Sequence, residues 1–468
     1  MIFKPAVLLS ILVGAIQPCL AQKPNILFIA VDDLRPELNC YGKTHIKSPN
    51  IDKLASRGVL FKRAYCQIPT CGASRASLLT GIRPTSTRFT SYQTFINKDA
   101  PDVTTLPKHL KDHGYHTVSN GKITHHRSDI PEHWSEKVWR PKAPMFMDPE
   151  NVALGRKLAA EAKKKNLKKA QRGPAFESFE APDSNYPDGM IADKTITDLR
   201  RLAKSEKPFF LAAGFMKPHL PFNCPKKYWD LYKAEDLPLA SNPFFPKDVP
   251  NGAIHNSGEL RSGYSGVPKS VPLPDDYSRQ LIHGYAACVS FTDAQIGKLL
   301  EELDSLDLTK NTIIILWGDH GWNLGDHTMW CKHSCFESSL HVPLIMAGPG
   351  ITSGKTNDGL TGLIDIFPTF CDLLGLEKPS HLDGSSFAPR LKDPSLEGNS
   401  AAFSRFGRGD TIRTDFFRFT NYGKSGTMLY DHRNDPSENT NISSSHSKES
   451  KDLNLRLQKE IRRTKMLN

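Results

Sequence analysis

The sequence has 468 residues, of which 38% are hydrophobic and 24% are charged. This balance is typical of a globular chain with a large core, so it excludes a disordered or fibrous protein. The formal net charge of +11 favours a polyanionic partner, such as a nucleic acid or an acidic polysaccharide.

The first 21 residues have the pattern of a secretory signal peptide. Lys4 precedes an apolar stretch over residues 6–16, and the small residue Ala21 ends the segment. We therefore predict a signal peptide over residues 1–21 and an exported protein, periplasmic or secreted. A buried N-terminal strand is the alternative. Elsewhere no apolar run reaches about 18 residues, so we expect no integral membrane segment.

Three nearly continuous apolar runs, at residues 25–31, 208–214 and 312–318, predict buried strands. Such runs are typical of parallel sheets that helices cover on both faces. Helix-like stretches at residues 105–113 and 293–303 separate them, so the pattern indicates an α/β domain. In sheets of this kind, ligands bind beyond the carboxyl ends of the strands.

Polar residues follow each predicted strand. Asp32 and Asp33 follow the first run, His219 comes shortly after the second, and Asp319 and His320 follow the third. We expect the three carboxylates to meet at one edge of the sheet. Close carboxylates raise one another's pKa unless a cation lies between them, and calcium prefers oxygen ligands. The pattern predicts a metal site; for Asp32 and Asp33 alone, turn residues after a strand are the alternative.

Two segments are less informative. Residues 155–170 form a lysine-rich stretch among alanines, which we interpret as a solvated helix face, with a binding arm as the alternative. Residues 240–275 are rich in Pro, Gly, Ser and Asn, and predict a long loop over the site.

The cysteines do not define a disulfide framework. Of nine cysteines, Cys19 belongs to the predicted signal peptide, and the other eight are irregularly spaced in a chain whose core is large enough without disulfides. Cys331, His333 and Cys335 look like half a zinc site, but no second pair has a matching spacing.

Beyond about residue 395 the pattern changes to short strands followed by helical spacing over residues 448–465. The strands expected here are residues 401–406, 411–419 and 427–430. We predict a catalytic domain over residues 22–395 and a small C-terminal subdomain over residues 396–468, made of an antiparallel sheet and a closing helix.

The segment 69–81 places Cys71 at the start of a probable helix, with Arg75 four residues later. Taken alone, Cys71 is either a thiolate nucleophile with a lowered pKa or an ordinary buried cysteine. The pattern Cys-x-Ala-Ser-Arg, followed by Leu-Thr-Gly, resembles the signature of type I sulfatases. The acidic pair at Asp32 and the Asp-His-Gly at Asp319 strengthen the resemblance.

The resemblance extends from residue 24 to about residue 344 and points to the iduronate-2-sulfatase branch of that family. The segments that carry it are residues 32–36, 48–52, 217–222 and 319–322. His320 is typical of this branch, whereas most sulfatases have Asn there. The resemblance implies an alkaline-phosphatase-like fold, a large mixed, mostly parallel sheet flanked by helices.

The resemblance also implies a cofactor and a modified residue. A maturation enzyme would oxidise Cys71 to formylglycine (3-oxoalanine), whose hydrate attacks sulfur with one hydroxyl and expels sulfate through the other. The implied ligands of one Ca²⁺ per chain are Asp32, Asp33, Cys71, Asp319 and His320.

The remaining roles follow from the same resemblance. Arg75 would orient the hydrate, Lys122 would bind sulfate, and His125 would assist the hydrate, with His126 as an alternative that the sequence leaves open. His219 and Lys332 would complete a cationic ring, and either would give a proton to the leaving oxygen.

We therefore expect a sulfuric ester hydrolase that removes sulfate from the chain ends of sulfated oligosaccharides. Algal glycans such as ulvan or carrageenan are preferred, and glycosaminoglycan iduronate 2-sulfate stays open. One alternative is a phosphoester or phosphonate hydrolase of the same superfamily. Another is a silent, exported polysaccharide-binding protein in which Cys71 stays a thiol. A nucleic-acid partner is not expected, because export removes it and no basic stripe is interleaved with aromatics.

Overall fold

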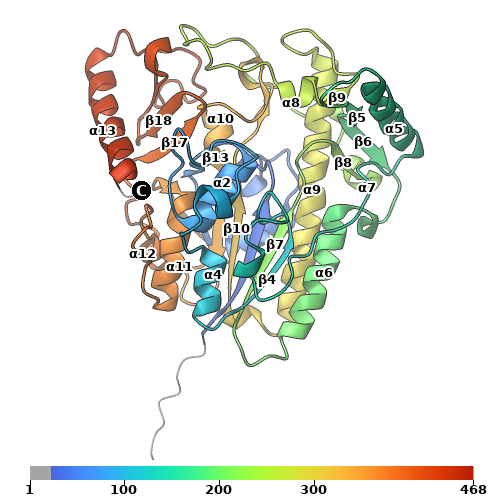
Figure 1. Ribbon diagram of the computed structural model, residues 1–468, viewed down its shortest axis with the longest axis vertical. Helices are drawn as coiled ribbons and strands as arrows, with labels where there is room; N and C mark the ends of the chain where they lie inside the picture. The colour runs from blue at the N-terminus through green and yellow to red at the C-terminus, as the bar shows by residue number, and fades with distance from the viewer. Residues whose placement is uncertain (1–22, 467–468) are drawn as a thin grey trace, which may run out of the picture.

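A computed structural model describes residues 23–466, so the predicted signal peptide lies outside the described residues. The centre of the protein is a seven-stranded sheet of order β15-β2-β14-β10-β1-β7-β4 (Figure 1). The strands are β1 (Asn25–Val31), β2 (Gly58–Phe61), β4 (His116–Gly121), β7 (Phe209–Phe215), β10 (Thr312–Gly318), β14 (Leu344–Ala347) and β15 (Lys355–Asn357). The neighbours β4, β7, β1 and β10 run parallel, and β14 runs antiparallel to both of its neighbours. The predicted mixed, mostly parallel sheet is confirmed.

Helices cover both faces of the sheet (Figure 1). Alternate side chains of β1 enter two separate cores, which explains why its sequence is apolar throughout. One core packs against α6 (Pro187–Leu202) and α9 (Asp275–Ser305). The other packs against α2 (Cys71–Thr80), α4 (Leu106–Asp112) and α11 (Ile366–Leu374). The predicted helices at residues 105–113 and 293–303 correspond to α4 and to part of α9.

The C-terminal part contains a four-stranded antiparallel sheet and a closing helix. The elements are β17 (Ala402–Phe406), β18 (Gly409–Arg413), β19 (Phe417–Asn421), β20 (Thr427–Asp431) and α13 (Ser447–Met466). Leu453 and Leu457 of α13 pack on Ile412 and Phe419 of the sheet.

The prediction of one strand over residues 411–419 is wrong, because the chain turns at residues 414–416. There the Thr414 backbone N–H donates to the Phe417 carbonyl over 2.8 Å, and Phe416 is exposed. Asp415 is typical of turns, but the residues on either side of it are apolar or β-branched and typical of strands, so the sequence pattern predicted one continuous strand. The division of domains at residue 395 stays a prediction.

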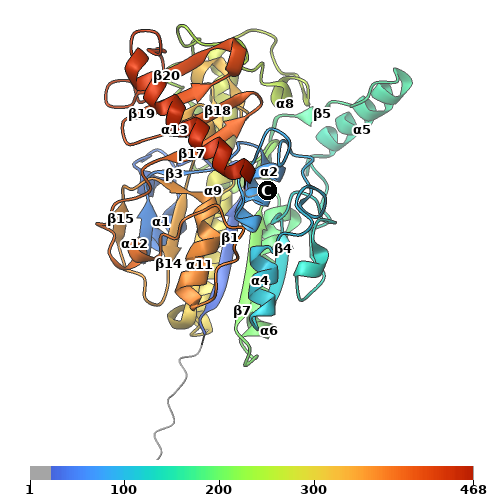
Figure 2. The same cartoon turned by 60° about the vertical axis from the view of Figure 1, so that its left-hand side comes forward.

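The two segments with weak patterns are close to expectation. Residues 240–275 are largely irregular and contain the short elements α8 (Gly258–Arg261) and β9 (Tyr264–Ser265). The lysine-rich stretch lies in and after α5 (Pro149–Lys164), which projects from the body of the molecule (Figure 2). The eight cysteines in the described part of the chain are all free. No helix within residues 23–466 is long and apolar enough to cross a bilayer.

Candidate active site

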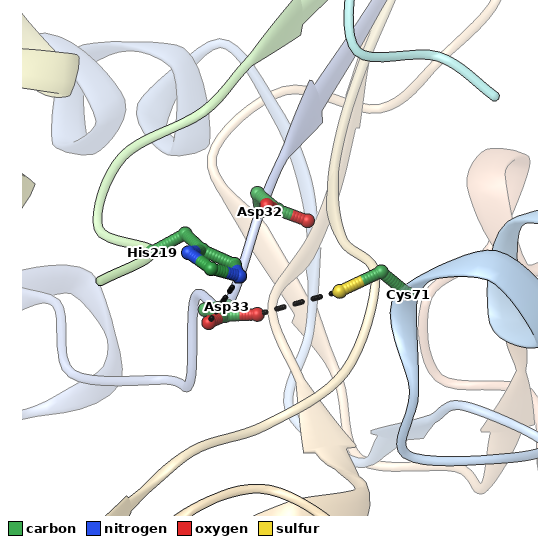
Figure 3. A group of neighbouring side chains, drawn as sticks. All are labelled: Asp32, Asp33, Cys71 and His219. Atoms are coloured by element: carbon green, nitrogen blue, oxygen red, sulfur yellow. Dashed lines mark hydrogen bonds and ion pairs between the residues drawn. The ribbon is translucent and has the colours of Figure 1, made fainter. Parts of the chain in front are cut away.

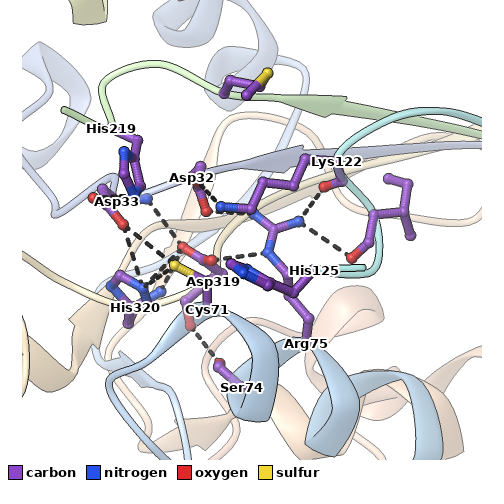
Figure 4. A network of polar contacts seen from close by, with 12 residues as sticks. Asp32, Asp33, Cys71, Ser74, Arg75, Lys122, His125, His219, Asp319 and His320 are labelled. Atoms are coloured by element: carbon purple, nitrogen blue, oxygen red, sulfur yellow. Dashed lines mark hydrogen bonds and ion pairs between the residues drawn. The ribbon is translucent and has the colours of Figure 1, made fainter. Parts of the chain in front are cut away.

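The carboxyl ends of four parallel strands bring polar side chains together at one edge of the central sheet (Figure 4). Parallel neighbours end at the same edge, so residues that are distant in sequence meet there. The residues are Asp32 and Asp33 after β1, Lys122 after β4, His219 beyond β7, and Asp319 and His320 after β10. Cys71, the first residue of α2, faces them.

Three buried carboxylates form the centre of the cluster. Asp32, Asp33 and Asp319 are each at most 1% exposed. The backbone N–H groups of Asp33 and His320 donate to Asp319 Oδ1 over 3.0 and 3.1 Å, which fixes the end of β10 against the end of β1. Asp33 has a φ of 62°, a left-handed conformation that Asp and Asn adopt more readily than most residues.

Possible ligand atoms lie within reach of one metal ion. One atom from each of Asp32, Asp33, Cys71 and His219 lies within 4.8 Å of the others (Figure 3). The same holds for Cys71, Asp319 and His320, so Cys71 belongs to both groups. Three of these six residues are aspartates, and carboxylate oxygens suit a hard divalent cation such as calcium.

Three buried cations neutralise the carboxylates. Arg75 donates to Asp319 Oδ2 over 2.9 Å and to Asp32 Oδ1 over 3.0 Å. Lys122 Nζ lies 2.5 Å from Asp32 Oδ2, and Lys332 Nζ lies 3.0 Å from Asp33 Oδ2. Burial alone would raise the pKa of Asp32, but Lys122 and Arg75 outweigh it and hold that pKa well below its usual range.

Arg75 also fixes the position of Lys122. Its guanidinium donates to the backbone carbonyls of Lys122 and Ile123, the latter over 3.2 Å. One side chain thus joins α2 to the end of β4 and to two carboxylates. Ser74 adds a further link, since its hydroxyl donates to the Asp319 carbonyl over 2.5 Å. The sequence analysis gave Ser74 no role, although it stands inside the signature.

Cys71 is 2% exposed and lies among acidic and imidazole groups. Its Sγ is 3.2 Å from His320 Nε2 and 3.8 Å from Asp33 Oδ1. Burial raises the pKa of the Cys71 thiol well above its usual value. Gly72 allows a close approach beside it, because a Cβ there would lie 2.4 Å from the Tyr92 carbonyl oxygen.

The two adjacent histidines differ in position. The ring of His125 points toward the cluster in Figure 4, and burial together with Lys122 lowers its pKa to about 3. The ring of His126 stacks on Phe95 with centroids 3.9 Å apart, and its Nε2 lies 3.1 Å from the Tyr92 carbonyl oxygen. The geometry therefore brings His125, and not His126, to the site.

Glu259 is a site residue that sequence analysis missed. It belongs to α8, within the segment expected to lie over the site, and no motif there marks it. Its carboxylate lies 3.2 Å from His219 Nε2 and 3.0 Å from Lys332 Nζ. Lys332 and Arg75 are both buried, and each forms an ion pair with an aspartate of the cluster.

Two family profiles match the sequence. The Sulfatase profile matches residues 24–376, and the profile described as N-sulphoglucosamine sulphohydrolase, C-terminal, matches residues 325–466. Iduronate 2-sulfatase of Homo sapiens is 34% identical over 445 residues, which cover 83% of this chain and 79% of the relative.

Solved structures show the same fold. The phosphonate monoester hydrolase of Agrobacterium radiobacter superimposes with a TM-score of 0.75 at 24% identity, covering 94% of this chain and 96% of that chain. A 2-O GAG sulfatase superimposes with a TM-score of 0.68 at 25% identity, covering 95% of this chain and 93% of that chain. Since the profile match spans most of the sequence and includes the segments that build the cluster, the chain belongs to the sulfatase family and is a sulfuric ester hydrolase.

Proposed function

We propose that the protein removes a sulfate ester from the terminal sugar of a sulfated oligosaccharide, after export directed by residues 1–21. The mature protein would hold one Ca²⁺ and a formylglycine made from Cys71 by a maturation enzyme. The observation that carries the proposal is the position of Cys71, which lies next to three buried carboxylates that are paired with Arg75, Lys122 and Lys332.

The donor set fits calcium. Asp32, Asp33 and Asp319 offer oxygen ligands, His320 adds one nitrogen next to Cys71, and all four residues are buried. Bound there, a calcium ion would supply positive charge beside the sulfuryl oxygens and would favour the ionised form of the residue 71 side chain.

The remaining residues bind and orient. Arg75 bridges Asp32 and Asp319 through two separate nitrogens, which fixes the two carboxylates relative to each other. Lys122 pairs with Asp32 and Lys332 pairs with Asp33, and in the proposed mechanism the two ammonium groups would bind the sulfate group. Such preorganised cations stabilise negative charge that develops during ester cleavage.

Proton transfer falls to histidines. His219 is the more exposed of the candidates for protonating the leaving oxygen, with a side chain 21% exposed, whereas that of Lys332 is 3% exposed. The Leu220 carbonyl lies 2.6 Å from His219 Nδ1, which directs Nε2 toward Asp33 and Glu259. His125, whose pKa is lowered to about 3, would be neutral near pH 7 and able to accept a proton from the nucleophile.

The relatives suggest the kind of sugar. Human iduronate 2-sulfatase, by its name, and the solved 2-O GAG sulfatase, by its title, support a 2-sulfated uronic acid of a glycosaminoglycan as one substrate. Algal glycans such as ulvan or carrageenan are the second class to be compared. The likeness to the phosphonate monoester hydrolase, at 24% identity, concerns the fold alone.

The test combines modification, metal and activity. We expect mass spectrometry to show that the peptide containing residue 71 has lost its sulfur, and metal analysis to find one calcium per chain. We also expect sulfate release from a panel of defined sulfated oligosaccharides. A chelator should abolish this release, and added calcium should restore it. The Cys71→Ala variant is the matched inactive control. An unmodified thiol, or faster cleavage of phosphate and phosphonate esters than of every sulfate ester in the panel, would overturn the proposal.

A further inference from the structure

A short segment outside the site carries a large share of the net charge. Residues 156–169 contain seven basic side chains and one acidic side chain, within a chain whose formal net charge is +11. The basic residues are Arg156, Lys157, Lys163, Lys164, Lys165, Lys168 and Lys169, and all are exposed. Within residues 23–466, none of the seven forms an ion pair. We call this segment the basic arm.

The basic arm extends away from the body of the molecule (Figure 2). Its helix α5 has 16 residues, and only Ala162 of these is fully buried. At about 1.5 Å per residue, α5 is about 24 Å long. After α5 the chain returns toward the N-terminal half of the helix. Residues 170–173 line a cavity of about 310 Å³ together with Val152 and Gly155, which lie in that half. The lysines at residues 163–165 therefore lie at the end of α5 that is distant from this returning strand.

A contact connects the basic arm to Tyr92, a residue next to the active site. Lys169 Nζ lies 3.3 Å from Tyr92 Oη and 5.7 Å from the centre of the Tyr92 ring. The Tyr92 ring in turn lies 5.9 Å from the His125 ring, and the Tyr92 backbone packs beside Gly72. The cationic surface thus begins next to the residue that follows Cys71 and continues outward along the arm.

We propose that the basic arm binds the part of an anionic polysaccharide that lies beyond the sugar unit being desulfated. The inference rests on the proposed function in that it takes the ligand to be a sulfated glycan. Seven unpaired cations on one projection repel one another, and a polyanion laid along them removes that repulsion. Because the arm contacts Tyr92 beside the site, a polysaccharide whose end occupied the site would reach the arm.

The composition of the arm favours a glycan over a membrane. A helix that inserts into a membrane surface needs an apolar face free to insert, whereas Leu154 and Leu158 of α5 are partly buried. Leu167, after the helix, is the large apolar side chain of this segment that is mostly exposed, at 59%. The surface offered to a partner is therefore cationic, with Tyr92 (42% exposed) at its inner end.

The experiment compares two variants with equal changes in charge. The arm variant replaces Lys163, Lys164, Lys165 and Lys168 by Gln, which keeps helix propensity. The control variant replaces four exposed lysines elsewhere by Gln, at Lys204, Lys207, Lys451 and Lys459. Each protein is tested for binding to dextran sulfate and to uncharged dextran at low and at physiological ionic strength. Sulfate release is measured with a monosaccharide sulfate and with a long sulfated oligosaccharide.

We expect the arm variant to bind dextran sulfate about ten-fold more weakly, the order expected for the loss of four exposed ion pairs, and to depend less on salt. Its KM for the long oligosaccharide should rise by a similar factor, while kcat and the KM for the monosaccharide sulfate stay unchanged. The control variant should change each value by less than about two-fold.

Three results would overturn the inference. The first is an equal effect in both variants, which would indicate bulk charge alone. The second is a loss of monosaccharide cleavage in the arm variant as large as its loss of oligosaccharide cleavage. The third is a larger loss of binding to phosphatidylglycerol vesicles or to single-stranded DNA than to dextran sulfate. Failure of the proposed function is a separate result, since it would show as no sulfate release by the wild-type protein, while the dextran sulfate comparison still tests the arm.

Discussion

Glu259 and Lys332 form an ion pair at the active site, with Lys332 Nζ 3.0 Å from the Glu259 carboxylate and also 3.0 Å from Asp33 Oδ2. The same carboxylate lies 3.2 Å from His219 Nε2. Glu259 thus holds two groups that we propose to contact the substrate, and its negative charge opposes the approach of any anion to them.

Replacing Glu259 by Gln should strengthen anion binding. At about 4 Å in a water-like environment, two unit charges interact by about 1 kcal/mol, and sulfate carries two, so the inhibition constant of inorganic sulfate should fall by at least about five-fold. We expect kcat to fall as well, because His219 and Lys332 lose a charged partner that orients them. Steady-state kinetics with sulfate as the inhibitor provides the measurement. The exposed Glu301→Gln variant is the control, and an unchanged inhibition constant in Glu259→Gln would count against this role.

Two substitutions at Asp33 should separate its charge from its backbone conformation. Asn tolerates the φ of 62°, whereas Ala there is strained by about 1–2 kcal/mol. Both variants should lose bound calcium and sulfate release, because each removes a carboxylate from the cluster. In the presence of a chelator, Asp33→Ala should unfold at a clearly lower temperature than Asp33→Asn, because only the Ala variant adds backbone strain. Metal analysis and thermal unfolding test this, and full calcium occupancy in Asp33→Asn would refute the assignment.

The adjacent histidines should differ in their effect on catalysis. His125→Ala should lower kcat by about 100-fold or more, the range expected for loss of a group that transfers a proton. His126→Ala should change kcat by only a few-fold, since its ring packs on Phe95 instead. Each is the control for the other in the same sulfate-release assay. A larger loss in His126→Ala would mean that the positions are exchanged in the working enzyme.

A buried ionic network joins the C-terminal sheet to the rest of the protein. Arg418, on β19 and 1% exposed, donates to Glu438 over 2.6 Å and to Glu337 of α10 (Glu337–Leu340). Burial alone would raise the pKa of Glu337, but Arg418 and Arg413 outweigh it and hold that pKa well below the ordinary 4.5. The pKa of Glu438 is also lowered, since Arg418 outweighs its burial.

This network should make stability depend on acid. A carboxyl whose pKa is lower in the folded state stabilises the fold above its unfolded pKa, and this contribution is lost as the pH falls through the folded pKa. Stability should therefore decrease below about pH 4.5. Arg418→Met should cost about 3–5 kcal/mol near pH 7, because two buried carboxylates lose their shared arginine and keep only Arg413 and His432 as cationic neighbours. That deficit should shrink in acid, and thermal unfolding across pH measures it; a deficit independent of pH would contradict the explanation.

The fold could be predicted from sequence where burial is complete. The segments that became β1, β7 and β10 are buried on both faces, so their apolar runs and the polar residues after them are visible without knowledge of the partners. The resemblance to sulfatases then assigned residues such as Lys122 and Lys332, which have no distinctive local pattern.

The rest depends on contacts between distant segments. Glu259 stands in an irregular stretch and reaches the site only because α8 packs near Lys332, 73 residues later. His125 and His126 cannot be distinguished from the sequence, because the difference depends on Phe95, on which the His126 ring stacks. The turn at residues 414–416 was not predicted from the sequence, because the residues on both sides of it are typical of strands.

The site is assembled from segments that leave the ribosome far apart in time. Cys71 and Arg75 are synthesised early, whereas Asp319 and Lys332 follow some 250 residues later, as the 244- and 299-residue separations of Arg75–Asp319 and Asp33–Lys332 show. Once these partners fold around it, Cys71 is 2% exposed. An enzyme that modifies its sulfur would therefore find the thiol accessible on the nascent chain and buried in the folded protein.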